Sequence, residues 1–269
     1  MISINTNYGS LFASKSAGAA QKSMNTAMER LSSGLRINNA KDDAAGQGIA
    51  TRLSAELRGI EMASRNASDA QSVIDTAESA HQEVHNILLR MREIAVQSAN
   101  GTLSSADRSA LNEEVSALET EITSIANNTS FAGVNLGTSV AVKFQIGANN
   151  GDTLDHTFKD FDATTISADV EVLSVGSAGE AISTLDAAIS LIATRRGELG
   201  ALSNRLSSTI ANLDNIAVNL SSARGRIQDT DFAKETSNLA KSQIMQQAAT
   251  AMLAQANASK GSVLTLIQN

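Results

Sequence analysis

Small and apolar residues follow one another at alternating spacings of three and four over one long segment of this sequence. The series begins at Ile60 and continues through Ala63, Ala67, Ala70, Ile74, Ala77, His81, Val84, Leu88, Met91 and Ala95. This spacing is typical of a coiled-coil seam, and the chain contains no Pro that could interrupt the helix. A helix from Ala44 to Ala99 is about 84 Å long, whereas a compact globule of this chain length has a radius of gyration of about 18 Å. The sequence therefore predicts a mainly α fold built as an elongated rod.

Two further helices are expected beside this one. Ser104 and Asp107 have the spacing of a helix start, and the seam that follows contains Leu111, Val115, Leu118, Ile122 and Ile125. The short link makes this helix antiparallel to the first. A later helix has apolar residues seven apart at Leu185, Ile192, Leu199, Leu206, Leu213, Leu220 and Ile227. Asp42 and Asp43 are expected to cap the first long helix and to place negative charge at its N-terminus.

The apolar period changes from helical to alternating between residues 131 and 175. Val140, Val142, Phe144 and Ile146 alternate with polar residues, and Leu154, His156 and Phe158 alternate again after the segment GANNGD. This pattern predicts a small β-hairpin region. A further strand is expected at Val170, Val172 and Leu173.

Both ends of the chain have amphipathic helical patterns with few charges. Residues 1–28 carry only Lys15 and Lys22, and residues 242–269 carry only Lys260. One interpretation is a pair of ordinary bundle helices or frayed tails. The other is that each end has an apolar stripe too long for the chain's own core to cover, so that the ends become ordered when identical copies assemble. The expected polymerisation residues are Leu11, Met24, Leu31, Met245, Met252, Val263 and Leu266.

Composition excludes several classes of protein. The chain has no Cys, which excludes disulfide scaffolds, thiol catalysis and cysteine zinc sites. The net charge is −7, whereas a nucleic-acid-binding protein is expected to carry a basic surface. No run approaches the roughly 18 to 20 apolar residues of a membrane span. The N-terminal residues lack the pattern of a cleavable signal, so we expect any export to use another route.

His81 and His85 have the four-residue spacing of helical metal ligands. However, Glu83 is not the residue directly after the first His, as the zincin pattern requires, and His81 lies on the predicted seam. A packed His is therefore favoured, and we expect no cofactor and no metal. The basic pair Arg195–Arg196 is interpreted as a solvated or ion-pairing face.

Five stretches identify a family. They are LSSGLRINNAKDDAAGQGIA at 31–50, RMREIAVQSANGT at 90–102, FQIGAN at 144–149, TIANLDNIAVNLSSARGRIQDTDFAKE at 209–235 and IMQQAATAMLAQAN at 244–257. In this order they closely resemble bacterial flagellin in a minimal form that lacks the variable outer domains. The resemblance implies that residues 1–40 and 231–269 form a helical polymerisation domain, the inner tube layer, whose helices pack in the polymer. Residues 41–230 would form the helical rod domain.

The resemblance implies a structural subunit of the extracellular flagellar filament, with no catalytic activity. Its implied partners are other flagellin subunits, a flagellar export chaperone, the type III export apparatus, the filament cap and the hook-junction proteins. No nucleic acid and no membrane are expected as partners. The alternative within the same apparatus is a hook-filament junction protein. Alternatives from other classes are a metal-dependent enzyme using His81 and His85, and a secreted membrane-disrupting helical protein.

A last expectation concerns three residues on the antiparallel helices. If the link is centred near Thr102, facing residues have numbers that sum to about 204, which brings Glu114 opposite Arg90. Ile94 is one helical turn from Arg90, so the three are expected to form one exposed patch. By resemblance, this patch contacts neighbouring subunits and a host Toll-like receptor.

Overall fold

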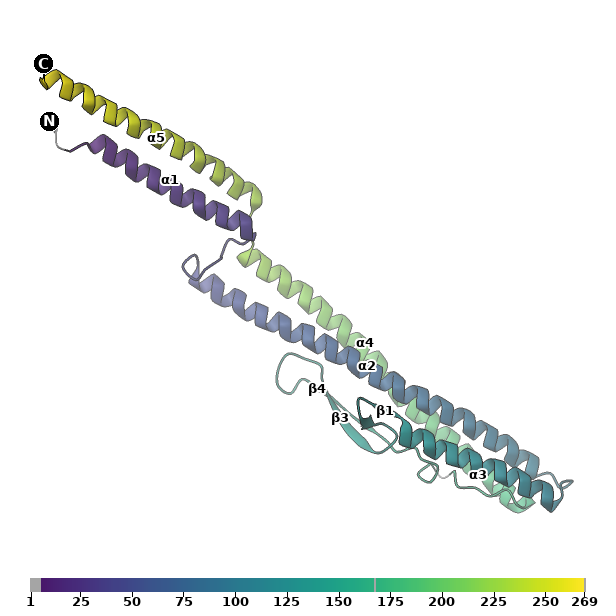
Figure 1. Cartoon of the computed structure of the whole chain (residues 1–269). Coiled ribbons are helices and arrows are strands. Elements are labelled where there is room, and N and C mark those ends of the chain that lie inside the picture. Colours follow the sequence, from purple (N-terminus) through teal and green to yellow (C-terminus); the bar gives the residue numbers. More distant parts are fainter. Residues whose placement is uncertain (1–5, 167, 269) are drawn as a thin grey trace. The chain divides into compact units, whose positions relative to one another are not determined.

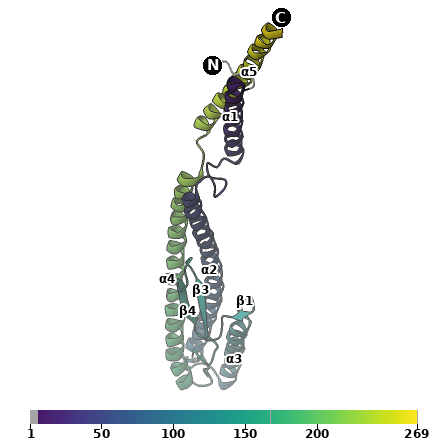
Figure 2. The ribbon, with the colours of Figure 1, turned by 90° about the vertical axis from the view of Figure 1, so that its left-hand side faces the viewer.

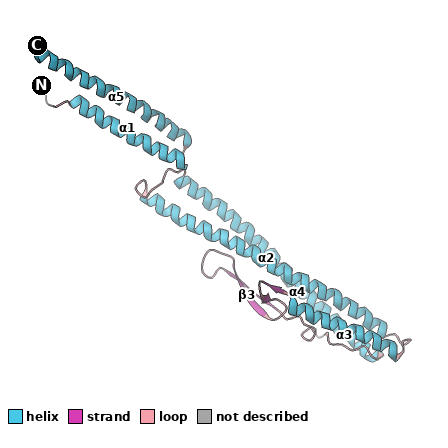
Figure 3. Ribbon diagram, viewed as in Figure 1, coloured by secondary structure: helices cyan, strands magenta, loops and turns pink. Residues whose placement is uncertain are grey.

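The computed structural model describes residues 6–166 and 168–268 (Figures 1 and 3). The chain divides into two compact units. The terminal unit comprises residues 1–55 and 219–269, and the central unit comprises residues 56–218. In chain order the described elements are α1 (Tyr8–Ser33), α2 (Ala44–Ser98), α3 (Ser105–Asn128), β1 (Ser130–Phe131), β2 (Val134–Asn135), β3 (Val140–Gln145), β4 (Thr153–Phe158), α4 (Val175–Gln228) and α5 (Phe232–Gln268).

The division between the units lies inside α2 and α4, whereas the sequence suggested boundaries at residues 40 and 231. Within the terminal unit, backbone hydrogen bonds join the segments near residues 40 and 231. Leu35 and Asp229 form an isolated β-bridge, and the Arg36 amide donates to the Gln228 carbonyl at 2.7 Å. These bonds tie the α1–α2 connection to the end of α4.

The central unit is built on α2, α3 and α4. Both α3 and α4 run antiparallel to α2. Arg92 Nε of α2 donates to Asp186 Oδ1 of α4 at 2.5 Å, and Arg196 of α4 donates to Glu78 of α2 at 2.7 Å. The predicted seam from Ile60 to Ala95 is buried at every position. The heptad positions of α4 are buried from Leu185 to Leu213 and half-buried at the two positions that follow. The sequence period therefore predicted the core of this unit correctly.

Arg108 holds the connection between α2 and α3. The predicted capping box is confirmed, because Ser104 and Asp107 exchange hydrogen bonds at the start of α3. The buried Arg108 guanidinium then donates to the Ser98, Asn100 and Leu103 carbonyls. Since the last carbonyls of a helix have no partner within it, the bond to the Ser98 carbonyl satisfies the last residue of α2, and the other two bonds hold the loop that follows.

The two aspartates before α2 have different roles. Asp43 Oδ1 accepts from the Gly46 amide at 2.9 Å and caps the helix as predicted. Asp42 instead accepts from the Asn38 and Asn39 amides at 3.2 and 3.0 Å, so its prediction as a helix cap is wrong. These backbone hydrogen bonds, above all that from Asn39, lower the pKa of Asp42.

The predicted hairpin is confirmed as β3 and β4, with Val142 opposite His156 and Phe144 opposite Leu154. Its inward side chains join a core cluster with α2 and α4, and Figure 2 shows both strands beside these helices. A second, very short hairpin, β1–β2, was not predicted from the sequence. Its turn has positive φ at Ala132 (49°) and Gly133 (84°).

The strand expected near Val170 is absent from the described residues, and that prediction is wrong. Val170 and Val172 are buried, but their amides donate to side chains of α3, Glu119 Oε1 and Asn112 Oδ1, at 2.9 and 3.0 Å. The Val172 carbonyl accepts from Ser98 Oγ at 2.5 Å. The alternation of apolar residues predicted the burial of this segment correctly. Its backbone amides, however, donate to side chains of a helix instead of to the carbonyls of a neighbouring strand.

Candidate functional site

The two terminal helices, α1 and α5, lie side by side and antiparallel (Figures 1 and 2). The two helices therefore cover each other along one face, as the bundle-helix interpretation expected. The predicted polymerisation residues Met245 and Met252 are nevertheless exposed, and ordering of the ends by assembly stays a prediction. The buried residues of the pair are small or polar and lie seven apart: Ala13, Ala20 and Ala27 on α1, and Glu235, Ser242 and Ala249 on α5. Small side chains at this spacing let two helices approach closely along one face of each.

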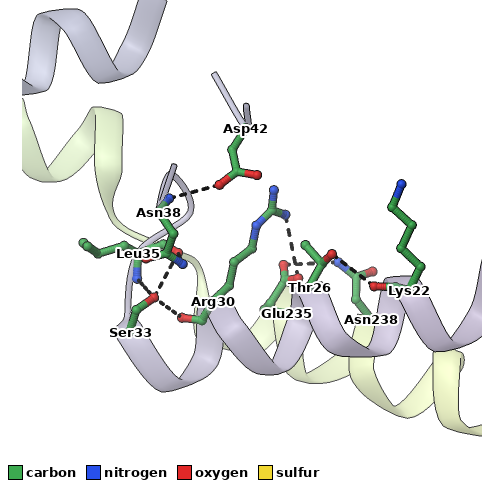
Figure 4. Close-up of polar contacts among 9 residues, drawn as sticks. All are labelled: Lys22, Thr26, Arg30, Ser33, Leu35, Asn38, Asp42, Glu235 and Asn238. Carbon is green, nitrogen blue, oxygen red and sulfur yellow. Dashed lines mark hydrogen bonds and ion pairs between the residues drawn. The ribbon is translucent and has the colours of Figure 1, made fainter. Parts of the chain in front are cut away.

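Polar contacts fix the register of the pair. Glu235 is only 7% exposed, and its carboxylate lies 3.8 Å from Arg30 Nη1 and accepts from Asn238 Nδ2 at 3.3 Å (Figure 4). At the other end, Asn7 Nδ2 donates to the Ala256 carbonyl at 3.0 Å. A groove of about 400 Å³ beside Glu235 is lined by Lys22, Arg30 and Lys241 among others.

The large apolar side chains of the pair point away from this seam. Phe12 is 74% exposed and Met252 is 64% exposed. The exposed large apolar residues on these helices are Tyr8, Leu11, Phe12, Met28, Phe232, Ile244, Met245 and Met252, and we call them the outer apolar set. Of this set, Phe12, Met245 and Met252 lie together along one groove, and exposed apolar side chains that gather in this way are typical of an interaction site.

The predicted polymerisation residues divide between the two faces. Leu11, Met245 and Met252 belong to the outer apolar set. Met24 and Leu31 are half-buried. The side chains of Val263 and Leu266 lie outside the part of the chain whose side chains are described. Phe12 has the largest exposed fraction in the set and was not among the predicted polymerisation residues.

Part of the outer apolar set lines a groove of about 460 Å³ between α1 and α5. Phe12 contributes from α1, and Met245 and Met252 contribute from α5. Ala13 and Ala249 of the seam also line this groove. The groove is therefore apolar, and its methionines are unbranched side chains that adapt to the shape of a partner.

The second predicted site lies on α2 and α3 of the central unit. Arg90 and Glu114 form the predicted pair, with Arg90 Nε and Nη2 donating to Glu114 Oε1 at 3.0 and 2.8 Å. Arg90 also donates to Glu93 at 3.2 Å, and these hydrogen bonds, above all those to Glu114, raise its pKa. Ile94 is 0% exposed, so the prediction that it belongs to an exposed patch is wrong. Because α2 packs against both α3 and α4, its buried face is wider than one seam and includes Ile94.

The histidine and arginine candidates are structural. His81 is buried, its Nδ1 lies 2.7 Å from the Ala77 carbonyl and its ring centroid lies 4.5 Å from that of Phe161. Burial lowers the pKa of His81. Arg195 is also buried and donates to the Asp160 carbonyl at 2.6 Å, so its interpretation as a solvated residue is wrong.

Two features of the described residues bear on the metal and membrane alternatives. They contain no group of three or more His, Asp or Glu side chains that could hold a metal ion. By length and composition, α4 is the one helix of the described chain that could cross a membrane. The heptad residues of α4 from Leu185 to Leu213 are buried, while Leu191 and Val218 of the same helix are exposed.

Comparison with known proteins gives matches along nearly the whole chain. Residues 4–137 match the bacterial flagellin N-terminal helical region, and residues 182–267 match the C-terminal helical region. A flagellin of Halalkalibacterium halodurans is 44% identical over 271 residues, covering 98% of this chain and 99% of the relative. Flagellin D of Vibrio anguillarum is 35% identical, and the match covers 99% of both chains. That alignment extends over 374 positions, so the Vibrio protein carries insertions that this 269-residue chain lacks.

Two solved structures are also similar. The crystal structure of Bacillus cereus flagellin matches with a TM-score of 0.51 and 32% identity, over 60% of this chain and 94% of that one. A hook-associated protein described from Vibrio parahaemolyticus matches with a TM-score of 0.59 over 70% of this chain and 100% of that one. At 17% identity, this second likeness shows the fold alone.

Proposed function

Since the chain belongs to the bacterial flagellin family and is a structural subunit of the extracellular flagellar filament, we propose that it polymerises through the outer apolar set of α1 and α5. The observation that carries this proposal is the arrangement of the helix pair. Alanines fill the space between the helices, while Phe12 and Met252 are mostly exposed. Fully burying a side chain of this size contributes about 1.5–3 kcal/mol, so covering several of them can drive association.

We infer that the outer apolar set, which extends along both helices, meets a different surface on the next copy. A surface that meets a different surface on the next copy makes a heterologous contact, which generates a helical filament where the rotation does not close. We assign residues 1–40 and 231–269 to the inner layer of this filament and residues 41–230 to the outer layer.

The test replaces one apolar anchor and one matched residue outside the terminal helices. Phe12→Ser should abolish salt-induced polymerisation as seen by electron microscopy, while the far-ultraviolet circular dichroism of the monomer stays unchanged. Val134→Ser, which also removes an exposed apolar side chain, should leave polymerisation intact. Normal filaments from Phe12→Ser would contradict the proposal.

A second proposed surface is the exposed group formed by Arg90, Glu93 and Glu114. The two glutamates hold the Arg90 guanidinium in one orientation, and charged groups held in this way can recognise a complementary polar surface. By family resemblance, we assign it to contacts between subunits and to recognition by a host Toll-like receptor, now without Ile94. Arg90→Glu should weaken receptor activation and polymerisation while the melting temperature of the monomer barely changes. Wild-type values in both assays would show that these three residues do not take part in either contact.

The remaining partners follow from the resemblance alone. We propose export without a cleavable signal through the flagellar type III apparatus, with a chaperone bound to the C-terminal helix, and contact with the filament cap and hook-junction proteins. We also propose that the protein has no catalytic activity.

A further inference from the structure

The exposed methionines are divided between the two units. Met245 and Met252 lie seven residues apart on one face of α5, are 45% and 64% exposed, and both line the apolar groove with Phe12. In the central unit, Met62 is 48% exposed and Met91 is 0% exposed. The chain has no Cys that could react first with an oxidant. The exposed thioethers are therefore its most readily oxidised side chains.

Oxidation of a methionine changes the character of its side chain. A peroxide transfers one oxygen atom to the sulfur, whose lone pair forms the new bond while the O–O bond breaks. The thioether becomes a sulfoxide, and hydrogen peroxide is reduced to water. The product is a polar, chiral side chain in place of a flexible apolar one, and a methionine sulfoxide reductase can reverse the change.

We propose that Met245 and Met252 are an oxidation site that controls whether the free chain can enter a filament. This inference rests on the proposed polymerisation through the outer apolar set. A sulfoxide in the groove places a polar oxygen where a neighbouring copy buries apolar surface, and a buried polar group without a hydrogen-bond partner is unfavourable. Peroxides therefore block assembly when they reach the chain before it polymerises. Assembled copies are protected because the same contact covers both sulfurs.

The helix pair itself survives this modification. The seam between α1 and α5 is formed by alanines, Ser242 and the Arg30–Glu235 ion pair rather than by Met245 or Met252. Oxidation at these two positions therefore changes the outer surface without removing a contact that holds α5 against α1. The modified chain stays folded but does not assemble.

The wild-type chain provides the most direct test. Monomers are treated with hydrogen peroxide until about half of the exposed methionines are oxidised and are then polymerised with salt. The polymer is sedimented, and mass spectrometry measures the sulfoxide fraction at each methionine. We expect sulfoxide at Met245 and Met252 to be at least fivefold depleted in the polymer relative to the supernatant, while sulfoxide at Met62 is equally distributed. Equal distribution of sulfoxide at all three positions would overturn the inference.

Variants separate this inference from the proposed function. Met28, which is 49% exposed on α1, is replaced by Leu in every variant so that it cannot be oxidised. In this background Met245→Leu/Met252→Leu should polymerise after peroxide treatment, whereas Met62→Leu should remain sensitive. Incubation of oxidised wild type with a methionine sulfoxide reductase should restore assembly. Peroxide sensitivity in Met245→Leu/Met252→Leu equal to that of wild type would contradict the site assignment.

The untreated variant Met245→Gln/Met252→Gln makes the two failures distinguishable, because glutamine is polar but cannot be oxidised in this way. We expect it to remain monomeric. If it polymerises like wild type, the groove is not an assembly surface and the proposed function fails with the inference. If it stays monomeric while oxidised wild type enters the polymer normally, the oxidation inference alone fails.

Discussion

The terminal and central units use their apolar residues in opposite ways. In the central unit, Leu88, Ile122 and Ile192 are fully buried among α2, α3 and α4. In the α1–α5 pair the buried apolar residues are alanines, and the large side chains such as Phe12 lie outside. A unit that buries its large side chains is stable by itself, whereas one that exposes them gains most of its apolar burial only when another molecule covers it. The two units therefore differ in where most of their large apolar side chains lie, which is inside the central unit and on the surface of the α1–α5 pair.

Charge is separated in the same way. The terminal unit contains 11 of the 21 Lys and Arg residues but only 6 of the 28 Asp and Glu residues. Its net charge is therefore +5, and that of the central unit is −12, which together give −7. The high negative charge keeps the central unit soluble. The apolar outer set lies on the unit whose charge is smaller.

The largest expected difference between the units comes from shortening one apolar side chain in each. Leu88→Ala should lower the free energy of unfolding of the monomer by about 2–5 kcal/mol, because it leaves a cavity in a packed core. Met252→Ala should change it by under about 0.5 kcal/mol, because its side chain is mostly exposed. Urea unfolding followed by circular dichroism measures both. Similar losses in the two variants would remove the contrast between the units.

Arg108 tests how the central unit closes the end of α2. Arg108→Ala removes the side-chain donor of the Ser98 and Leu103 carbonyls, while the Asn100 carbonyl keeps the Leu103 amide. We expect a loss of about 1–3 kcal/mol in unfolding free energy. Arg205→Ala removes an exposed arginine of α4 and serves as the matched control. If both variants unfold at the same urea concentration, the α2–α3 connection does not depend on this side chain.

Ala20 tests the close approach of the terminal helices. Ala20→Leu should destabilise the helix pair by about 1–3 kcal/mol, because the larger side chain has no space in the seam. Ala19→Leu adds the same side chain at an exposed position. Amide hydrogen exchange along α1 and α5 should accelerate in the first variant and stay unchanged in the second. Unchanged exchange in both would show that the alanine seam does not hold the pair.

The smallest expected effect is a dependence on pH in the central unit. Burial lowers the pKa of His81, with the nearby Arg195 and Arg196 acting in the same direction and Glu78 and the Ala77 hydrogen bond opposing them. The unfolded chain therefore binds a proton at this residue more readily than the folded one, so stability falls as pH falls below about 6.5. Urea midpoints between pH 7.5 and 5.5 should decrease less for His81→Gln than for wild type. Parallel curves would show that His81 does not contribute.

The sequence predicted the parts of the fold in which apolar residues recur at a regular spacing. The helices of the central unit, their seams and the β3–β4 hairpin follow from spacing, and the pairing of Arg90 with Glu114 follows from the short link between two antiparallel helices. Ile94 was misplaced because one seam was assigned to α2, whereas contacts with two helices bury a wider face. The apolar spacing within one helix does not show how many other helices pack against it.

The remaining features have no periodic signal. Arg108 acts through carbonyls of a loop, and the Val170 segment finds hydrogen-bond partners in helix side chains, so neither could be derived from apolar spacing. The pairing of α1 with α5 was one of two interpretations that the sequence left open, because an alanine stripe is a weak apolar signal. The polymerisation residues stay a prediction. Leu11, Met245 and Met252 are exposed, and the division between a seam of small residues and exposed large side chains could not be derived from spacing.

Single cysteines test the assembly surface most directly, because the natural chain has none. Met252→Cys and Val134→Cys are each labelled with a water-soluble maleimide, once as monomer and once as filament. We expect the thiol at position 252 to react readily in the monomer and at least tenfold more slowly in the filament, while the thiol at position 134 reacts at similar rates in both. Equal reactivity of the thiol at position 252 in monomer and filament would contradict polymerisation through the outer face of the terminal helices.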